Sequence, residues 1–348
     1  FIAAILSVTG ADPLCAEDTP ARVEKWADNR LTVTSELELW LDATRVNGTE
    51  LVPHDGKIAK WFDASGKQRH FQQPVADAQP VRLPVGETAI VRFDGVDDFL
   101  RQAQTHQERD RLSVFIVASP RKNPGGFRAV LATNETEQRD YESGMTIDFG
   151  PTATSRFSVL NVEGRGFGTW KNLLTAERSF RELNVFEIVA DSAAVQLKVD
   201  GVQAGERPRD GSPISLSEIS VGARYYTLGG GPQQVQGFGS WDIAEILIYG
   251  RLLTTDETQQ LHKYFDEKYK GIQEQLPADA DGDIAMLEPI ENPPPIQTLL
   301  PGFSVNELPV ELTNINNLLY RPDGTLFALA YNGIIWKLTD TDGDGLED

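Results

Sequence analysis

Four aspartates at metal-ligand spacing stand in the run TDTDGDGLED, residues 339–348. They are Asp340, Asp342, Asp344 and Asp348. Alternate carboxylates can converge on one point, Leu346 can lend its carbonyl oxygen, and two glycines permit the tight turn of a calcium loop. Without a cation, carboxylates this close repel one another. The spacing therefore predicts that the four aspartates bind calcium, and a solvated acidic turn is the alternative.

Hydrolysis of a glycosidic bond needs two carboxyl groups, one protonated and one ionised. The closest acidic pairs in strand-like segments are Glu36 with Glu38 and Asp242 with Glu245. On a regular strand Asp242 and Glu245 point to opposite faces, so their spacing does not suit catalysis. The residues disfavour a glycoside hydrolase, which stays an alternative.

Glu245 lies in an unusual context for a carboxylate. It alternates in phase with apolar and aromatic residues, namely Trp241, Ile243, Leu247 and Tyr249. A carboxylate on an apolar face must accept hydrogen bonds or be protonated. We predict a buried structural acid, and we expect Glu245→Gln to fold with a modest loss of stability.

Other groups of potential ligands are weaker. Asp94, Asp97 and Asp98 either bind calcium or shape a turn around Gly95, and the flanking phenylalanines favour the turn. The four histidines have no zinc-ligand spacing. The glycine-rich stretches do not open a helix after a strand, so they do not predict a dinucleotide site.

Sugar recognition relies on exposed aromatic rings that stack on the apolar face of a pyranose, with polar groups alongside. Trp170, beside Gly168, is one candidate. Arg224, Tyr225 and Tyr226, before a glycine-rich loop, are the others. We predict that these four residues bind the ligand, and packing in the core or at a strand edge is the alternative.

Ten short segments have the alternation or composition of strands, and Gly, Pro and Asp turns separate them. They are 37–43, 89–95, 112–119, 127–133, 144–150, 156–162, 184–191, 194–201, 219–226 and 242–250. No amphipathic helix lies between them, so the pattern predicts an all-β, antiparallel sandwich or barrel.

One helix is predicted after the strands. Thr254 and Glu257 form a candidate capping box, and the helix is expected to end at Gly271. Residues 272–298 are acidic and rich in proline, which is typical of a linker. Residues 299–348 begin a second β unit, too short to enclose a sizeable core, which we expect to be truncated.

The N-terminal residues 1–16 are apolar and then small or polar, which indicates a truncated signal peptide cut after Ala16. Its removal would take away Cys15, the single cysteine, and with it any disulfide. The formal net charge of −20 disfavours nucleic acid as a partner. No other run is long enough to span a membrane, and the signal peptide leads us to expect a periplasmic, secreted or cell-surface protein.

Three groups of segments together resemble the concanavalin A-like, laminin G-like jelly-roll domains of exported bacterial proteins. They are LELWLDA with WFDASGK (61–67), VRFDGVDDFL (91–100) and the stretch from Trp241 to Gly271. The resemblance spans about 31–271. It implies an antiparallel jelly-roll sandwich closed by one C-terminal helix. The hydrolases of this class carry Glu-x-Asp-x-Glu or Glu-x-Asp-x-x-Glu on one strand, and neither acidic pair here matches.

From Leu299 the chain resembles the first blade of the β-propeller in glucose/sorbosone-type dehydrogenases. The likeness is to large planctomycete proteins described as membrane-bound dehydrogenases, in which Trp-Lys-Leu runs into Asp-Thr-Asp-Gly-Asp-Gly. This resemblance implies a quinone cofactor and catalytic residues in the rest of a propeller. None of them falls on residues of this sequence.

We therefore expect an exported, non-catalytic recognition module, with a glycan or a cell-surface protein as its partner, attached to a propeller dehydrogenase. The first alternative is a structural or protein-interaction domain without a glycan ligand. The second is a glycoside hydrolase of the concanavalin-like class.

Overall fold

In the computed structural model the chain divides into two units, Phe1–Glu288 and Pro289–Asp348. The described residues of the first unit are 23–48, 56–103, 107–227 and 231–277. Those of the second unit are 310, 312, 315–330, 333–343 and 346–347. The predicted signal peptide, most of the predicted linker, Asp344 and Asp348 lie outside the described residues.

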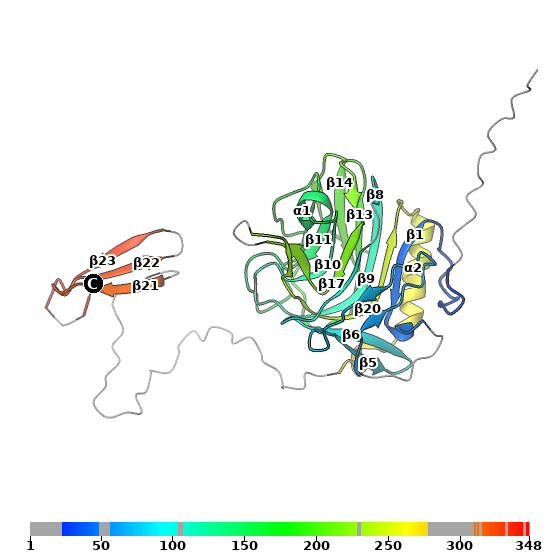
Figure 1. The fold of residues 1–348 in the computed structure, drawn as a ribbon, viewed down its shortest axis with the longest axis horizontal. Helices are drawn as coiled ribbons and strands as arrows, with labels where there is room; N and C mark the ends of the chain where they lie inside the picture. The colour runs from blue at the N-terminus through cyan, green and yellow to red at the C-terminus, as the bar shows by residue number, and fades with distance from the viewer. Residues whose placement is uncertain are drawn as a thin grey trace, which may run out of the picture. The chain divides into compact units, whose positions relative to one another are not determined.

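The first unit is built on a larger and a smaller antiparallel sheet (Figure 1). The larger sheet has the order β15 (Val202–Pro208), β14 (Ala194–Val199), β13 (Asn184–Ala190), β9 (Leu112–Lys122), β20 (Ser240–Tyr249), β6 (Thr88–Asp94), β5 (Val81–Val85) and β2 (Gly56–Lys57). One edge of β20 is shared, since β6 pairs with its first half and β1 (Leu37–Asp42) with its second half.

The smaller sheet faces the larger one across the main core. Its order is β12 (Asn161–Gly164), β11 (Met145–Asp148), β10 (Ala129–Asn134), β17 (Glu218–Val221), β7 (Leu100–Ala103), β4 (Phe71–Gln72) and β3 (Lys60–Trp61). Two short two-stranded antiparallel sheets complete the unit, β8 (Glu108–Arg109) with β16 (Ile214–Ser215) and β18 (Arg224–Tyr226) with β19 (Gln234–Gln236). The all-β sandwich expected from the sequence is confirmed.

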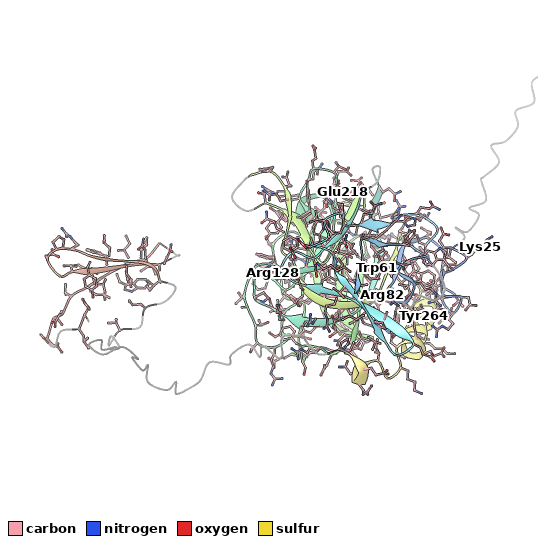
Figure 2. The ribbon with its side chains drawn as sticks, turned by 60° about the horizontal axis from the view of Figure 1, so that its bottom comes forward. Lys25, Trp61, Arg82, Arg128, Glu218 and Tyr264 are labelled. Carbon is pink, nitrogen blue, oxygen red and sulfur yellow. The ribbon has the colours of Figure 1, made fainter. Side chains whose placement is uncertain are left out.

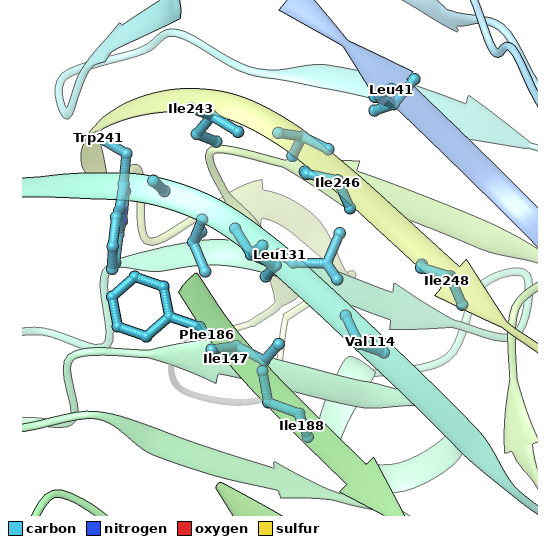
Figure 3. Close-up of a cluster of buried hydrophobic side chains, with 14 of the residues drawn as sticks. Leu41, Val114, Leu131, Ile147, Phe186, Ile188, Trp241, Ile243, Ile246 and Ile248 are labelled. Atoms are coloured by element: carbon cyan, nitrogen blue, oxygen red, sulfur yellow. The ribbon is translucent and has the colours of Figure 1, made fainter. Parts of the chain in front are cut away.

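The core between the sheets takes apolar side chains from both of them (Figure 3). In β14, Val195 and Leu197 are buried, while Gln196 and Lys198, which alternate with them, are partly exposed, as the alternation predicts. Phe149, which directly follows β11 of the smaller sheet, stacks on Trp241 of β20 with ring centroids 4.5 Å apart. Burial of each such large side chain stabilises the fold by roughly 1.5–3 kcal/mol.

A second core lies between the larger sheet and helix α2 (Thr255–Lys268). Thr254 and Glu257 form the predicted capping box, and the helix ends within three residues of Gly271 as expected. Its buried face carries Leu261, Tyr264, Phe265 and Lys268. The helix lies beside β1 and β20 (Figure 1), and Tyr264 is labelled on it in Figure 2.

Several predicted boundaries and faces are wrong. Segment 156–162 forms a strand only from Asn161, and segment 219–226 is divided by Gly222 into β17 and β18. Gly222 has φ +82°, and a Cβ there would lie 2.2 Å from the ring of Phe93, so only glycine fits this corner. A helical turn not predicted, α1 (Asp140–Ser143), follows β10.

The phase predicted for Glu245 is right with respect to Leu247 and Tyr249, which share the core under α2, and wrong with respect to Trp241 and Ile243. A register shift between Ile243 and Glu245 marks a bulge in β20. Trp241 and Ile243 point into the main core, whereas Glu245 lies under α2. Because of this bulge, Asp242 and Glu245 lie on the same face of β20 rather than on opposite faces.

The second unit contains a three-stranded antiparallel sheet of β21 (Ile315–Tyr320), β22 (Leu326–Ala330) and β23 (Ile335–Leu338). A turn at residues 321–324 joins β21 to β22, with the Gly324 N–H donating to the Arg321 carbonyl at 3.0 Å. Within the part of this unit that the structure describes, large apolar side chains remain exposed. They are Leu318, Leu319, Tyr320, Leu329, Ile334 and Ile335.

Candidate functional site

Trp170 has the most exposed indole in the chain. All six tryptophans lie among the described residues, and Trp170 is the one classed as exposed, at 47%. It follows β12 in a run whose residues 168–171 are all exposed. One side of its ring packs near Gly150, since a Cβ there would meet the indole at 3.5 Å. About half of the residue's surface is thus open to solvent.

Buried polar side chains hold the backbone on both sides of Trp170. Arg207 of β15 is buried and donates to the carbonyls of Thr169 at 2.8 Å and Gly168 at 2.6 Å. On the other side, the Lys171 N–H donates to the side-chain oxygen of Asn161 at 2.8 Å. These bonds restrain the backbone of the loop on both sides of the indole.

Arg224, a predicted ligand residue, lies in a buried ionic cluster. Its guanidinium donates to Asp140 at 2.9 and 3.0 Å and to Asp148 at 3.1 Å, and it lies 3.1 Å from Glu163. Burial alone would lower the pKa of Arg224, but the three carboxylates outweigh it and raise that pKa. With only 2% exposed, this arginine holds α1, β11 and β12 together and does not reach a surface ligand.

Asp148 connects this cluster to the Trp170 loop. Its carboxylate accepts from Arg224, from the Gly150 N–H at 2.7 Å and from the Asn161 side chain at 3.2 Å. Burial raises the pKa of Asp148 to about 6, the charge of Glu163 adds to the shift, and Arg224 opposes it. Asp148, Asn161 and Arg207 could not be identified from the sequence, because strand alternation does not say which polar residues meet.

Tyr225 and Tyr226, the remaining predicted ligand residues, are buried at 9% and 8% exposure. The Tyr225 ring packs against the guanidinium of Arg101, 4.4 Å from its centroid, and the Tyr226 ring packs against Arg224 at 4.9 Å. The geometry favours the packing alternative for both tyrosines. Of the four residues predicted to bind the ligand, only Trp170 offers an exposed ring.

One member of each acidic pair considered for hydrolysis, Glu38 and Asp242, is held by arginines. Glu38 lies 2.7 Å from Arg69 and 2.6 Å from Arg109, while Asp242 accepts two 2.8 Å bonds from Arg92. Each of these pairings neutralises a carboxylate that is largely withdrawn from water. The geometry therefore supports structural roles for Glu38 and Asp242.

Glu245 is fully buried, as predicted, beneath α2. It accepts hydrogen bonds from the Trp40 indole at 2.6 Å, Tyr264 at 2.8 Å and Tyr269 at 2.7 Å, and from Lys268 at 2.9 Å. Burial raises the pKa of Glu245, and the charge of Asp42 adds to that shift against the influence of Lys268. The prediction of a satisfied structural acid is confirmed in its contacts.

The two aspartate clusters have different geometries. Asp94, Asp97 and Asp98 bring their carboxylates within 4.8 Å of one another, and the Val96 N–H donates to Asp94 at 2.7 Å, as in a turn. Burial raises the pKa of Asp98 to about 6, with Asp94 adding to the effect. In the other cluster, Asp340 accepts from the Gly343 N–H at 2.7 Å.

The sequence and the structure were compared with known proteins. No protein-family model matches the sequence, and no curated protein does. Among solved structures, Trypanosoma rangeli sialidase in complex with sialic acid matches with a TM-score of 0.44 and 14% identity over 66% of this chain. The chain spans about a third of that protein, 33% of its length.

Two further solved structures are similar at the same level. One is domain 4 of AbnA, a GH43 extracellular arabinanase from Geobacillus stearothermophilus, in complex with arabinotriose. It matches with a TM-score of 0.43 and 13% identity, over 65% of this chain and 99% of that one. The other is the receptor binding domain of botulinum neurotoxin type G, with a TM-score of 0.43 and 12% identity, over 66% and 51% of the two chains. We transfer no activity or ligand from likenesses at this level.

Among the helices in the described residues, none combines the length and the apolar character needed to cross a membrane.

Proposed function

We propose that the sandwich unit is a non-catalytic recognition module that binds a carbohydrate through the surface around Trp170. The observation that carries this proposal is an exposed indole on a loop fixed by buried polar side chains. The C–H groups on one face of a pyranose pack on such a ring, and rigid aromatic side chains lose little entropy on binding. The exposed Lys171 and Glu206 stand close by to pair with sugar hydroxyls, since the Lys171 ammonium donates to the Glu206 carbonyl at 3.0 Å.

The carboxylates support a module without hydrolytic activity. Retaining and inverting glycosidases keep one carboxyl group protonated and another ionised across an open cleft. Here Glu38 and Asp242 are paired with arginines, and Glu245 is enclosed beneath α2. The glycoside hydrolase is therefore the weaker alternative.

A glycan array probed with the full chain tests the carbohydrate proposal. We expect binding to at least one class of polysaccharide, and Trp170→Ala is expected to weaken it markedly. Val75→Ala, which also truncates an exposed apolar side chain at 59% exposure, serves as the matched control and should bind like the wild type. Absence of binding to every glycan would contradict the proposal.

A protein partner is the second candidate, favoured by the exposed apolar residues of the second unit. Leu319 and Ile335 are 65% and 64% exposed on its three-stranded sheet. Exposed apolar clusters of this kind often mark protein interfaces. Pull-down of a reproducible partner by the wild type, and its loss in a Leu319→Ser, Ile335→Ser double variant, would support this alternative over a glycan ligand.

We also retain, as proposals, the features that rest on the resemblance of residues 299–348. These are export from the bacterial cytoplasm, a propeller dehydrogenase attached to the sandwich, and a quinone cofactor held outside this sequence. The antiparallel order of β21, β22 and β23 is compatible with part of a propeller blade. The gene sequence beyond Asp348 tests the proposal directly, because a propeller requires further blades.

A further inference from the structure

Three reactive side chains from three separate elements meet beneath α2. Asp42 ends β1, Glu245 lies opposite to it in register on β20, and Lys268 ends α2. The Lys268 ammonium nitrogen lies 2.9 Å from an Asp42 oxygen and 2.9 Å from a Glu245 oxygen. All three side chains are 0% exposed. A lysine ammonium and two carboxyl groups are therefore held in contact in a site closed to bulk water.

The surroundings of this triad exclude water and add two charged side chains, Asp28 at 3.9 Å from the lysine nitrogen and Arg45 at 2.9 Å from an Asp42 oxygen. The rings of Tyr264 and Tyr269 lie 5.2 and 5.3 Å from the lysine nitrogen, and Trp40 donates to Glu245. An ammonium and a carboxylate in such a site pay a large desolvation penalty, which a neutral amide would remove. The second core around them is built from aromatic and aliphatic side chains.

We propose that Lys268 and Asp42 form an intramolecular amide cross-link, with Glu245 as the proton carrier. A proton passes from the Lys268 ammonium to the Glu245 carboxylate, which leaves an amine and a carboxylic acid. The amine nitrogen then attacks Cγ of Asp42, a C–N bond forms, and Glu245 donates a proton to the carboxyl oxygen while it takes one from nitrogen. The C–O bond breaks, a hydroxyl leaves with a proton as water, and the carbonyl re-forms.

Other contacts assign Asp42 as the group attacked and Glu245 as the carrier. The Thr44 N–H donates to one Asp42 oxygen at 2.8 Å and Arg45 donates to the other at 2.9 Å. Both donors can stabilise the negative charge that develops on oxygen during attack. Glu245, whose pKa burial raises, is the carboxyl group better able to hold a proton for transfer.

Intact-mass measurement of the wild-type chain tests the proposal. We expect a mass lower than that of the sequence by one water molecule, and a proteolytic map with one peptide pair joined through Asp42 and Lys268. Lys268→Met and Glu245→Gln should each have the full mass of their sequence. Lys263→Met, on the same helix with its lysine 76% exposed, should still lose water.

An Asp42→Asn variant adds a signature that a simple ion pair cannot give. Attack on a carboxamide releases ammonia in place of water, so the mass deficit should change accordingly. A wild-type chain with its full sequence mass and no joined peptides would overturn the proposal, even if every variant failed to fold. A join between Lys268 and Glu245 would overturn the assignment of Asp42.

Discussion

At the scale of single residues, each of four buried carboxylates in this sandwich is satisfied by a different set of partners. Glu38 and Asp242 are paired with arginines, Glu245 accepts four hydrogen bonds, and Asp148 shares Arg224 with two other acids. The sequence predicted that Glu245 would be buried and satisfied, since a carboxylate among strand apolar residues has few other fates. It did not predict Lys268 as a partner, because that contact joins residues far apart in the chain.

The pKa of Asp148 gives a stability prediction at this scale. Its value of about 6 in the fold lies above its ordinary 3.8, so between these values the folded state binds more protons than the unfolded state. This group therefore adds stability as the pH falls from 6 to 4, by no more than about 3 kcal/mol. Asp148→Asn should lack this contribution.

Thermal unfolding of the wild type and of Asp148→Asn between pH 4 and pH 7 checks this sign. The difference in stability, wild type minus variant, should rise as the pH is lowered. A difference that stays constant across this range would show that Asp148 has an ordinary pKa.

At the scale of elements, features set by contacts between residues close in the chain could be predicted from the sequence. Features set by contacts between distant segments could not. The α2 boundaries followed from Thr254 and Glu257, whose capping contacts lie within one turn. The face of Glu245 did not, since the bulge in β20 depends on sharing an edge between β1 and β6. The same limit applies to Arg224, whose burial depends on α1 and β11 packing around it.

The capping box of α2 gives a second prediction. The Glu257 N–H donates to the Thr254 hydroxyl at 3.2 Å, and Thr254→Ala removes this acceptor. We expect the free energy of unfolding to fall by about 1 kcal/mol. Urea unfolding measures the change, and Gln259→Ala, an exposed site on the same helix, is the control. If both variants lowered the free energy of unfolding equally, the loss in Thr254→Ala would not come from the cap.

The acidic loop of the second unit gives a third prediction. We propose that Asp340 and Asp342, with Asp344 and Asp348, bind calcium in the full-length protein. Calorimetric titration should give a calcium heat signal that disappears in the Asp342→Ala, Asp344→Ala double variant. A signal that survives in the double variant would place calcium elsewhere.

At the scale of the whole molecule, the central claim is that the sandwich recognises a carbohydrate through one exposed ring. The sequence predicted the antiparallel sandwich and named Trp170 as a candidate contact. It could not separate Trp170 from Tyr225 and Tyr226, because exposure depends on which loops cover the edge of the smaller sheet. The structure describes Trp170 as exposed and the two tyrosines as buried.

Calorimetric titration of the best glycan from the array, into the wild type, Trp170→Phe and Trp170→Ala, tests this claim most directly. We predict that Trp170→Ala weakens the affinity by roughly tenfold or more, a loss of about 1.4 kcal/mol, and that Trp170→Phe lies between the two because it keeps a smaller ring. Equal affinities for all three proteins, with folding unchanged, would contradict the claim.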